Sequence, residues 1–370
     1  MKKLSRKCNT EKISSVSNCD VLVVHANEGL YQSGRKDYLL NQLKQNGLKL
    51  EEVVLEKENS IVSRKLTSGP YKYDDKYKVF EGYANYLKDT YNPKLIITER
   101  NGCLVAPFFK ARFEGDSKSL HLPHCVLNDQ TRNHSMMDYN YFPVYGPSSL
   151  NYLKTLKDGF GSCELFFGGS YLFNEDFKLP DPDKSLPVLY LGMGPQLEDK
   201  KRGIETNKIV AEWQKKTGKE LIVRLHQRSK GTFWKELNQP GVTILPAESF
   251  VESAKRCSMM LSPYTNAVVD ACLLRRPCQL VATPNEVDYL EVERFFGKRA
   301  VNAKEVESSI NAHFANFENS LNNCDKLKDY HLSQGNQSVN YLSELIMNII
   351  NGKKVTPVSI RNYDGTFTDF

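Results

Sequence analysis

Four polar loops in the second half of the sequence each follow a short apolar run and carry residue types that suit phosphate binding. They are Gly192-Met193-Gly194, His226 with Arg228, Glu248 with Ser249, and Ser262 to Asn266. Glycine lets a ligand approach the backbone closely, while histidine and arginine supply hydrogen bonds and positive charge. Because ligands bind outside the carboxyl ends of the strands in open parallel sheets, we expect these loops to form a pocket for a phosphorylated ligand.

The last of these loops lies in the segment "CSMMLSPYTNAVVDACLLRRP", residues 257–277. Its methionine and leucine run predicts a buried strand, and its Ala- and Leu-rich continuation predicts a helix. The first N–H groups of a helix have no intrahelical partner, so the turn between the two elements favours an anion. The candidate binding residues of this turn are Ser262, Tyr264, Thr265 and Asn266. The simpler alternative is that the threonine or the asparagine only caps the helix.

Candidate acid–base groups follow apolar runs in the first half. Glu99 is our first choice as a general base, because "KLIITERNG" leads an apolar strand directly into Glu-Arg-Asn-Gly. Glu28 is the second choice and His124, in "HLPHCVLND", is the third. Each of the three, taken alone, also fits a purely structural role. The neighbouring basic residues that suit an anionic acceptor, or are simply solvated, are Arg35, Lys36 and Arg100.

The elements that must position these residues alternate along the chain. Apolar runs that predict strands occupy 21–29, 50–56, 93–102, 188–194, 220–228, 241–246 and 278–282. Segments that predict helices occupy 35–47, about 79–91, about 203–217 and about 249–256. Alternating strands and helices indicate an α/β protein in which helices cover both faces of a parallel sheet.

A linker divides this pattern into two halves. Residues 174–187 are rich in proline and acidic residues, which is typical of an exposed connection between domains. We therefore expect a polar extension over 1–19, one domain over 20–173 and a second over 188–337. The last apolar helix lies in 338–370, and we expect it to cross back onto the first domain before a tail.

Composition and charge narrow the class of protein. The 370 residues are 40% hydrophobic and 25% charged, as in ordinary globular proteins, with a formal net charge of +6. The basic residues are dispersed, so we expect no nucleic-acid partner. The chain has no apolar run long enough to span a bilayer, and its polar start differs from a signal peptide. We therefore expect a cytoplasmic protein.

The metal-binding residue types are scattered. The nine cysteines form no CxxC pair and are odd in number, which favours reduced thiols over a disulfide framework. The seven histidines show no spacing typical of a zinc site. We expect neither a metal nor another cofactor.

The second half of the sequence resembles the nucleotide-binding half of GT-B glycosyltransferases. It is most similar to bacterial capsule and lipopolysaccharide enzymes that use CMP-activated ulosonic acids such as Kdo or sialic acid. The resemblance rests on "VLYLGMG", "VRLHQR…GTFWKEL" and "ILPAESFVESAKRCSMMLSPYTNAVVDACLLRRP". It implies two Rossmann-like domains that face each other across a cleft. In those families a His-Pro pair binds the donor phosphate, and here His226 keeps the histidine while Gln227 replaces the proline.

The resemblance also implies roles for individual residues. The donor phosphate would sit before Thr265 and Asn266, and Asp270 would hold a ribose or only stabilise a local network. The base would come from Glu99, Glu28 or His124 in the first half, where "HLPHCVLND" is similar to a loop of the "HLPHG" type in relatives.

The resulting functional hypothesis is a glycosyltransferase that moves a sugar, preferably a CMP-linked acidic sugar, to a bacterial surface glycan. A lipid-linked glycan acceptor would bring the protein to the inner face of the membrane. The alternatives are a polyol-phosphate transferase of the CDP-glycerol or CDP-ribitol type, a UDP-sugar-dependent transferase or epimerase, and a non-catalytic nucleotide-binding protein.

Overall fold

The computed structural model describes residues 17–72, 77–99, 103–129 and 135–370. The chain divides into two compact units. Unit 1 comprises Met1–Asn174 and Ser333–Phe370, and unit 2 comprises Glu175–Leu332. The chain therefore leaves unit 1 once and returns to it at its C-terminal end, and the segment expected as a linker is grouped with unit 2.

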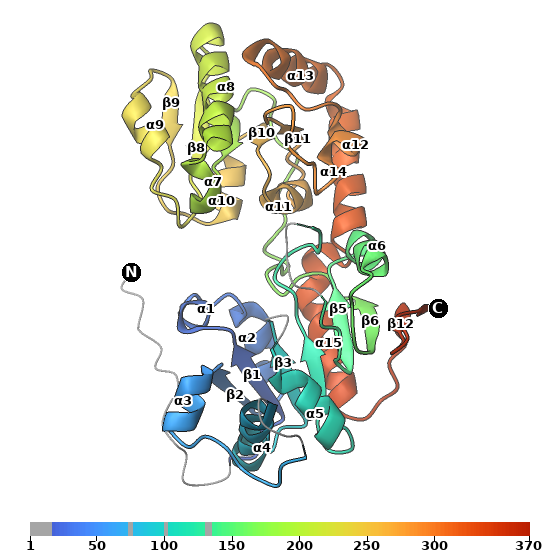
Figure 1. Cartoon of the computed structure of the whole chain (residues 1–370). Coiled ribbons are helices and arrows are strands. Elements are labelled where there is room, and N and C mark those ends of the chain that lie inside the picture. The colour runs from blue at the N-terminus through green and yellow to red at the C-terminus, as the bar shows by residue number, and fades with distance from the viewer. Residues whose placement is uncertain (1–16, 73–76, 100–102, 130–134) are drawn as a thin grey trace. The chain divides into compact units, whose positions relative to one another are not determined.

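Unit 1 is built on an eight-stranded sheet with the order β13-β12-β6-β5-β4-β3-β1-β2 (Figure 1). The strands are β1 (Val21–His25), β2 (Leu50–Val54), β3 (Leu95–Thr98), β4 (Lys118–His121), β5 (Tyr141–Val144), β6 (Cys163–Phe167), β12 (Ser359–Arg361) and β13 (Phe367–Asp369). Neighbouring strands in the series β2, β1, β3, β4, β5 and β6 run parallel to each other. Strand β12 runs antiparallel to both β6 and β13.

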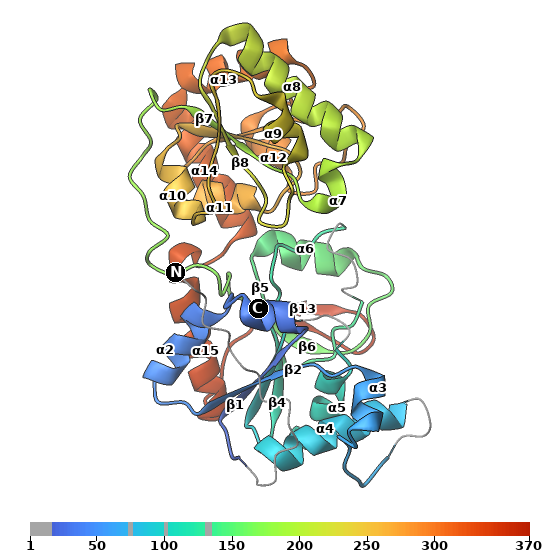
Figure 2. The same cartoon turned by 90° about the vertical axis from the view of Figure 1, so that its left-hand side faces the viewer.

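Helices cover both faces of this sheet. They are α1 (Glu28–Gln32), α2 (Asp37–Gln45), α3 (Glu58–Ser63), α4 (Lys78–Tyr91), α5 (Val105–Phe113), α6 (Pro147–Thr155) and α15 (Ser338–Ile350), with a short 3-10 helix at Gly335–Gln337. Figure 2 shows α2 and α15 on one side of the sheet and α3, α4 and α5 on the other. The C-terminal helix thus completes the core of the N-terminal sheet.

The alternation of side chains along β1 explains the two layers. Successive residues of a strand point to opposite faces. Val21 and Val23 pack with α2 and α15, whereas Leu22 and Val24 pack with α3, α4 and α5. The first four residues of the strand are therefore all apolar, as expected for a strand buried on both faces.

Unit 2 holds a five-stranded parallel sheet with the order β11-β10-β7-β8-β9. Its strands are β7 (Val188–Leu191), β8 (Leu221–Arg224), β9 (Val242–Ile244), β10 (Met259–Ser262) and β11 (Cys278–Leu280). Its helices are α7 (Pro195–Glu198), α8 (Lys201–Thr217), α9 (Thr232–Leu237), α10 (Phe250–Lys255), α11 (Ala267–Leu273), α12 (Val292–Phe296), α13 (Ala303–Ala315) and α14 (Phe317–His331).

The end of the chain differs from the expected tail. Residues after α15 form the antiparallel pair β12 and β13, closed by a turn in which the Asn362 amide donates to the Thr366 carbonyl at 2.9 Å. Gly365 has a positive φ in this turn, which glycine adopts without strain. Strands of three residues give too little alternation to be predicted from the sequence.

No disulfide joins any of the eight cysteines in the described ranges. Among the described residues, no helix combines the length and the apolar character that crossing a bilayer requires.

Candidate functional site

Two strands of unit 1 lead into candidate catalytic residues at the point where the strand order reverses. The order β2-β1-β3-β4 changes direction between β1 and β3, and in open parallel sheets ligands bind outside the carboxyl ends at such a point. His25 ends β1, and Glu99 follows β3 directly. Both side chains are buried. The first-choice base therefore lies where this fold class binds its ligands.

Glu99 forms a buried ion pair with Lys36, which precedes α2. Its carboxyl oxygen Oε2 contacts the Lys36 ammonium and lies 3.4 Å from the donating hydroxyl of Tyr171. The Lys36 ammonium also lies 5.7 Å from the centre of the Tyr171 ring. The other carboxyl oxygen, Oε1, is buried and accepts no hydrogen bond from any described residue. This oxygen therefore has unused acceptor capacity.

Opposing effects set the protonation of this pair. Burial by itself raises the pKa of Glu99, but the charge and the hydrogen bond of Lys36 outweigh burial, so that this pKa lies below its ordinary value. Burial lowers the pKa of Lys36, although Glu99 opposes that change. The carboxylate is therefore ionised at neutral pH, which is the form that a general base requires.

His25 and Glu52 extend the cluster. His25 Nδ1 lies 3.3 Å from Lys36 Nζ, and His25 Nε2 lies 2.9 Å from Glu52 Oε2. A neutral imidazole with its proton on Nε2 satisfies both contacts, because it donates to the carboxylate and accepts from the ammonium. His25 is not among the residues predicted from the sequence, where it reads as part of a strand. Its position at the carboxyl end of β1 is the signal that could have identified it.

The predicted acceptor residues behave differently from one another. Lys36 is not free to bind a substrate anion, because it is buried and paired with Glu99. Arg35 is half-buried, and its positive charge lowers the pKa values of both Glu99 and His124. Arg100 lies outside the described residues.

The two other candidate bases lie at the surface. Glu28 is exposed in the first turn of α1, where its carboxylate accepts a hydrogen bond of 2.6 Å from the Gln32 side chain. His124 also reaches the surface, yet partial burial of its ring and then the charge of Arg35 lower its pKa. It is therefore largely neutral at neutral pH. Neither residue shares a hydrogen bond with Glu99 in the described part of the chain.

In unit 2 the strand order reverses between β7 and β10. The loop from Gly192 to Gly194 follows β7, and Pro263 to Asn266 follow β10, so that both loops lie at the switch point. The loop after β8 joins them, because His226 Nε2 lies 3.8 Å from the position that a Cβ would take on Gly194. The loops after β7 and β8 thus lie close together, and the loop after β10 leaves the neighbouring strand at the same edge of the sheet. A Cβ on Gly192 would lie 2.9 Å from the Arg224 carbonyl oxygen. We therefore assign this glycine to the close packing of β7 against the end of β8.

His226 is held in one tautomer. Its Nδ1 accepts a hydrogen bond of 3.2 Å from the Arg228 backbone amide. In the neutral ring the proton is therefore on Nε2, which faces Gly194 as a donor. Partial burial and then the positive charge of Arg228 lower the pKa of His226, so the ring is neutral at neutral pH. A neutral imidazole N–H suits the oxygen of a phosphate or a sugar.

Glu198, at the end of α7, fixes the loop that carries His226. Its carboxylate accepts hydrogen bonds from the Ser229 hydroxyl, from the Lys230 amide at 3.0 Å and from the Gly231 amide at 3.3 Å. Burial alone would raise the pKa of Glu198, but these hydrogen bonds lower it overall. Glu198 is not among the residues predicted from the sequence, because these hydrogen bonds join segments that are far apart in the chain.

The turn after β10 only partly fits the predicted anion site. Helix α11 has seven residues, so its dipole is short and contributes little. Thr265 Oγ1 accepts a hydrogen bond of 3.3 Å from the Ala267 amide, as the capping alternative predicts. Asn266 stands at the N-cap position but makes no side-chain capping bond, and its Oδ1 is buried without a hydrogen-bond partner among the described residues. The site therefore depends on Asn266 and His226 more than on the helix.

Four predicted donor-binding side chains already have structural partners in unit 2, and their roles toward a ligand stay predictions. Ser262 is buried and donates to the Pro263 carbonyl at 2.7 Å. Ser249 caps α10 by accepting from the Glu252 amide at 3.1 Å. The remaining two are Glu248, which accepts from Ser253 at 2.8 Å and pairs with Arg256 at 3.2 Å, and Tyr264, whose hydroxyl accepts from Arg299 at 2.8 Å.

Two further candidates stay predictions. The Arg228 side chain is exposed beside His226, where it can reach an anion. Asp270 is half-buried, and its charge acts on Arg224, which binds the Glu248 carbonyl at 3.0 Å. This places Asp270 in a local network, which is one of its two expected roles. Within the described ranges, no three His, Cys, Asp or Glu side chains gather closely enough to hold a metal ion.

Solved structures with the same architecture cover nearly the whole chain. An S. aureus MnaA–UDP complex has a TM-score of 0.58 at 11% identity and covers 91% of this chain and 99% of that chain. The UDP-GlcNAc 2-epimerase from Neisseria meningitidis bound to UDP-GlcNAc has a TM-score of 0.54 at 10% identity, with coverages of 89% and 99%. A glycosyltransferase from Rickettsia africae has a TM-score of 0.56 at 11% identity, with coverages of 92% and 100%.

The chain has a GT-B-like fold. This confirms the α/β architecture of two Rossmann-like domains that the sequence predicts. The sequence matches no protein-family model and no curated protein. At identities this low the likeness establishes the fold, and the activity has to be argued from the site.

Proposed function

We propose that this chain is a UDP-sugar epimerase that inverts one carbon of a UDP-linked N-acetylhexosamine. The observation that carries the proposal is the ionised Glu99 at the switch point of unit 1, whose buried Oε1 accepts no hydrogen bond from the described residues. Inversion of C2 requires that a proton be removed from one face of the sugar while the electrons of the C–H bond expel UDP from C1, after which a proton is added to the other face of C2 and UDP returns to C1. Lys36 and His25 lie in the same cluster, and both side chains can supply a proton.

Unit 2 supports a nucleotide substrate. The Nε2–H of His226, the open side of Gly194 and the buried Oδ1 of Asn266 offer a donor, a close backbone approach and an acceptor. Two of the solved structures with this fold hold UDP or UDP-GlcNAc. We therefore prefer a UDP-linked sugar to the CMP-linked acidic sugar that the sequence resemblance implies, which gains no support from these structures.

The second candidate is an inverting glycosyltransferase that uses the same donor. It is favoured by the R. africae structure, which is a glycosyltransferase of equal coverage. In that reaction Glu99 would remove a proton from an acceptor hydroxyl on a glycan or lipid-linked glycan. The polyol-phosphate transferase and the non-catalytic alternative have no structural observation in their favour.

The test combines binding with product analysis. We expect calorimetric titration with UDP, CMP, CDP and GDP to show the tightest binding for UDP. Incubation with UDP-GlcNAc alone should then give its C2 epimer, identified by NMR, without accumulation of free UDP. Tightest binding of CMP would refute the proposed donor. Consumption of UDP-GlcNAc only when a glycan acceptor is added, with release of UDP, would refute epimerisation in favour of the second candidate.

A further inference from the structure

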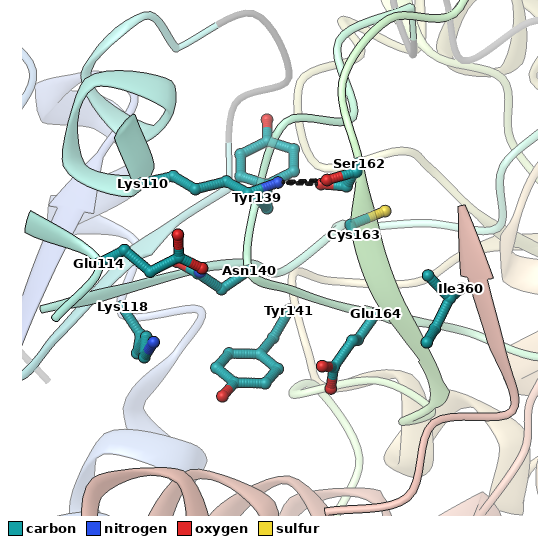
Figure 3. Close-up of a pocket in the computed structure, with 10 residues that line it drawn as sticks. All are labelled: Lys110, Glu114, Lys118, Tyr139, Asn140, Tyr141, Ser162, Cys163, Glu164 and Ile360. Atoms are coloured by element: carbon teal, nitrogen blue, oxygen red, sulfur yellow. Dashed lines mark hydrogen bonds between the residues drawn. The ribbon is translucent and has the colours of Figure 1, made fainter. Parts of the chain in front are cut away.

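A second hollow lies in unit 1 where the central strands begin. It has a volume of about 220 Å³ and is lined mainly by residues at the start of β4, β5 and β6, with contributions from α5 and β12 (Figure 3). Lys118 is the first residue of β4 and Tyr141 the first of β5. Glu99, by contrast, follows the carboxyl end of β3. The hollow is therefore at the opposite edge of the sheet from the candidate catalytic cluster.

The pairing of the strands brings three polar side chains onto one face. Tyr141 is the register partner of Glu164 on β6, and Glu164 is the partner of Ile360 on β12. Residues paired in this way point to the same side of a sheet. Figure 3 shows Lys118, Tyr141 and Glu164 extending to the same side, with the tyrosine ring between the two charged groups.

These three side chains have unused hydrogen-bonding capacity. Among the described residues, the Tyr141 hydroxyl and the Glu164 carboxylate have no hydrogen-bond partner, and Lys118 forms no ion pair with a contact of 4.0 Å or less. Lys118 and Glu164 still act on each other electrostatically. Burial raises the pKa of Glu164 and Lys118 opposes this, so the carboxylate is partly desolvated and gains from a donor.

The polar side chains at the back wall of the hollow already form hydrogen bonds within the protein. Lys110 is buried and donates to Asp138 at 2.9 Å and to the Ser162 hydroxyl at 2.7 Å. Asn140 donates to the Glu114 carboxylate at 3.0 Å. A rigid polar wall of this kind orients a ligand without having to rearrange.

We propose that this hollow binds one sugar ring that is neutral or carries an amino group. Its volume lies below the range of about 300–1,000 Å³ that encloses larger ligands, so it suits a single ring. The face of Tyr141 can pack against the C–H groups of a pyranose, while Glu164 and Lys118 bind its hydroxyl groups.

Charge decides between classes of sugar. The charge of Lys110 is neutralised by its ion pair with Asp138. The other charged groups that line the hollow are the carboxylates of Glu114 and Glu164 and the ammonium of Lys118. The remaining negative charge favours an amino sugar and opposes a uronic acid or a phosphorylated sugar. This inference does not depend on the proposed function, since no residue of the hollow belongs to the epimerase site.

The test is an NMR titration of the full chain with D-glucosamine, methyl β-D-glucopyranoside and D-glucuronate. We expect the first two to bind and glucuronate to bind at least about tenfold more weakly. Glu164→Gln, which keeps the size of the side chain, should raise the Kd of glucosamine about tenfold or more, because a hydrogen bond to a charged group is lost. Tyr141→Phe should weaken both sugars less, since it keeps the ring.

The matched control is Glu58→Gln, an exposed carboxylate on α3 that should leave all three titrations unchanged. Failure of glucosamine and the glucoside to bind, equal binding in Glu164→Gln, or tightest binding of glucuronate would each overturn the proposal. Titration of the same variants with UDP separates this result from the proposed function, because UDP affinity should be unaffected by Glu164→Gln.

Discussion

The Lys36 ammonium keeps Glu99 ionised in a buried position. Without a cation, a carboxyl group that is removed from water prefers its neutral form. The ion pair reverses that preference, and it leaves Oε1 without a hydrogen bond from the described residues. The same pair places Lys36, which we expected to bind an acceptor, in the candidate catalytic cluster.

Replacement of Lys36 should change the pH dependence of turnover. The pKa of Glu99 is depressed, so activity is present above that pKa and falls as the pH drops through it. Lys36→Met removes the largest effects that oppose burial and should move the acidic limb of the kcat/KM profile upward by at least about one pH unit. Lys36→Arg, which keeps the charge, should leave the limb nearly in place.

The control for this profile is Lys49→Met, an exposed lysine outside the cluster. Loss of one partner of a buried pair costs about 3–5 kcal/mol, so folding of each variant is verified by circular dichroism. A Lys36→Met profile that coincides with that of the parent would contradict the assignment of Glu99.

His226 should contribute to nucleotide affinity through its Nε2–H group. We expect His226→Ala to weaken UDP binding by about 1–3 kcal/mol in calorimetric titration, as for the loss of one buried or charge-assisted hydrogen bond. His226→Gln keeps an N–H donor on a side chain of similar length and should lose less. Equal affinity in the parent and in His226→Ala would exclude this residue from the site.

At the scale of elements, the loop between β8 and α9 owes its shape to a carboxylate on a different element. Glu198, on α7, accepts hydrogen bonds from the Lys230 and Gly231 amides, and the same loop carries His226. The geometry of the loop that carries His226 therefore depends on a residue that need not contact a ligand.

Weakening this support should loosen the loop. Glu198→Gln removes the charge from the hydrogen bonds, and we expect faster hydrogen exchange at Lys230 and Gly231 together with a severalfold rise in the Kd for UDP. Glu236→Gln, an exposed residue of α9, is the matched control. Unchanged exchange at both amides would show that Glu198 does not hold the loop.

The alternation of apolar and polar residues was enough to predict which loops meet at the strand ends. It located Glu99 after β3 and His226 after β8, because a loop that follows a buried strand must emerge at the sheet edge. It could not predict the partners of these residues. The pairing of Lys36 with Glu99 and of Glu198 with Ser229 depends on how distant segments pack, which periodicity does not encode. The hydrogen bond of Ser262 is different, because its acceptor is the carbonyl of the next residue, Pro263.

At the scale of the whole molecule, each unit has its own core, and that of unit 1 depends on the end of the chain. Ile346 on α15 is fully buried in the layer that covers the N-terminal sheet. Both tryptophans of the chain, Trp213 and Trp234, belong to the core of unit 2. Tryptophan fluorescence therefore reports unit 2, whereas far-ultraviolet circular dichroism reports both units.

Ile346→Ala should separate these two signals. Removal of a buried isoleucine side chain costs about 2–5 kcal/mol, so part of the circular dichroism transition in urea should move to lower concentration while the fluorescence transition stays in place. Ile310→Ala in the core of unit 2 is the matched control and should move the fluorescence transition. An equal shift of both signals in Ile346→Ala would show that the two units unfold as one.

The most direct measurement of the central claim is proton NMR of UDP-GlcNAc incubated with the protein in D₂O. If Glu99 removes a proton from the sugar carbon that is inverted, the C2 epimer should appear, and deuterium should replace hydrogen at that carbon in product and recovered substrate. Glu99→Gln should lower the rate by about 10²–10⁴ while UDP affinity stays nearly constant, and Glu28→Gln should remain within about threefold of the parent. Absence of both epimer and deuterium exchange in a protein that binds UDP, or a Glu99→Gln rate within about threefold of the parent, would contradict the account.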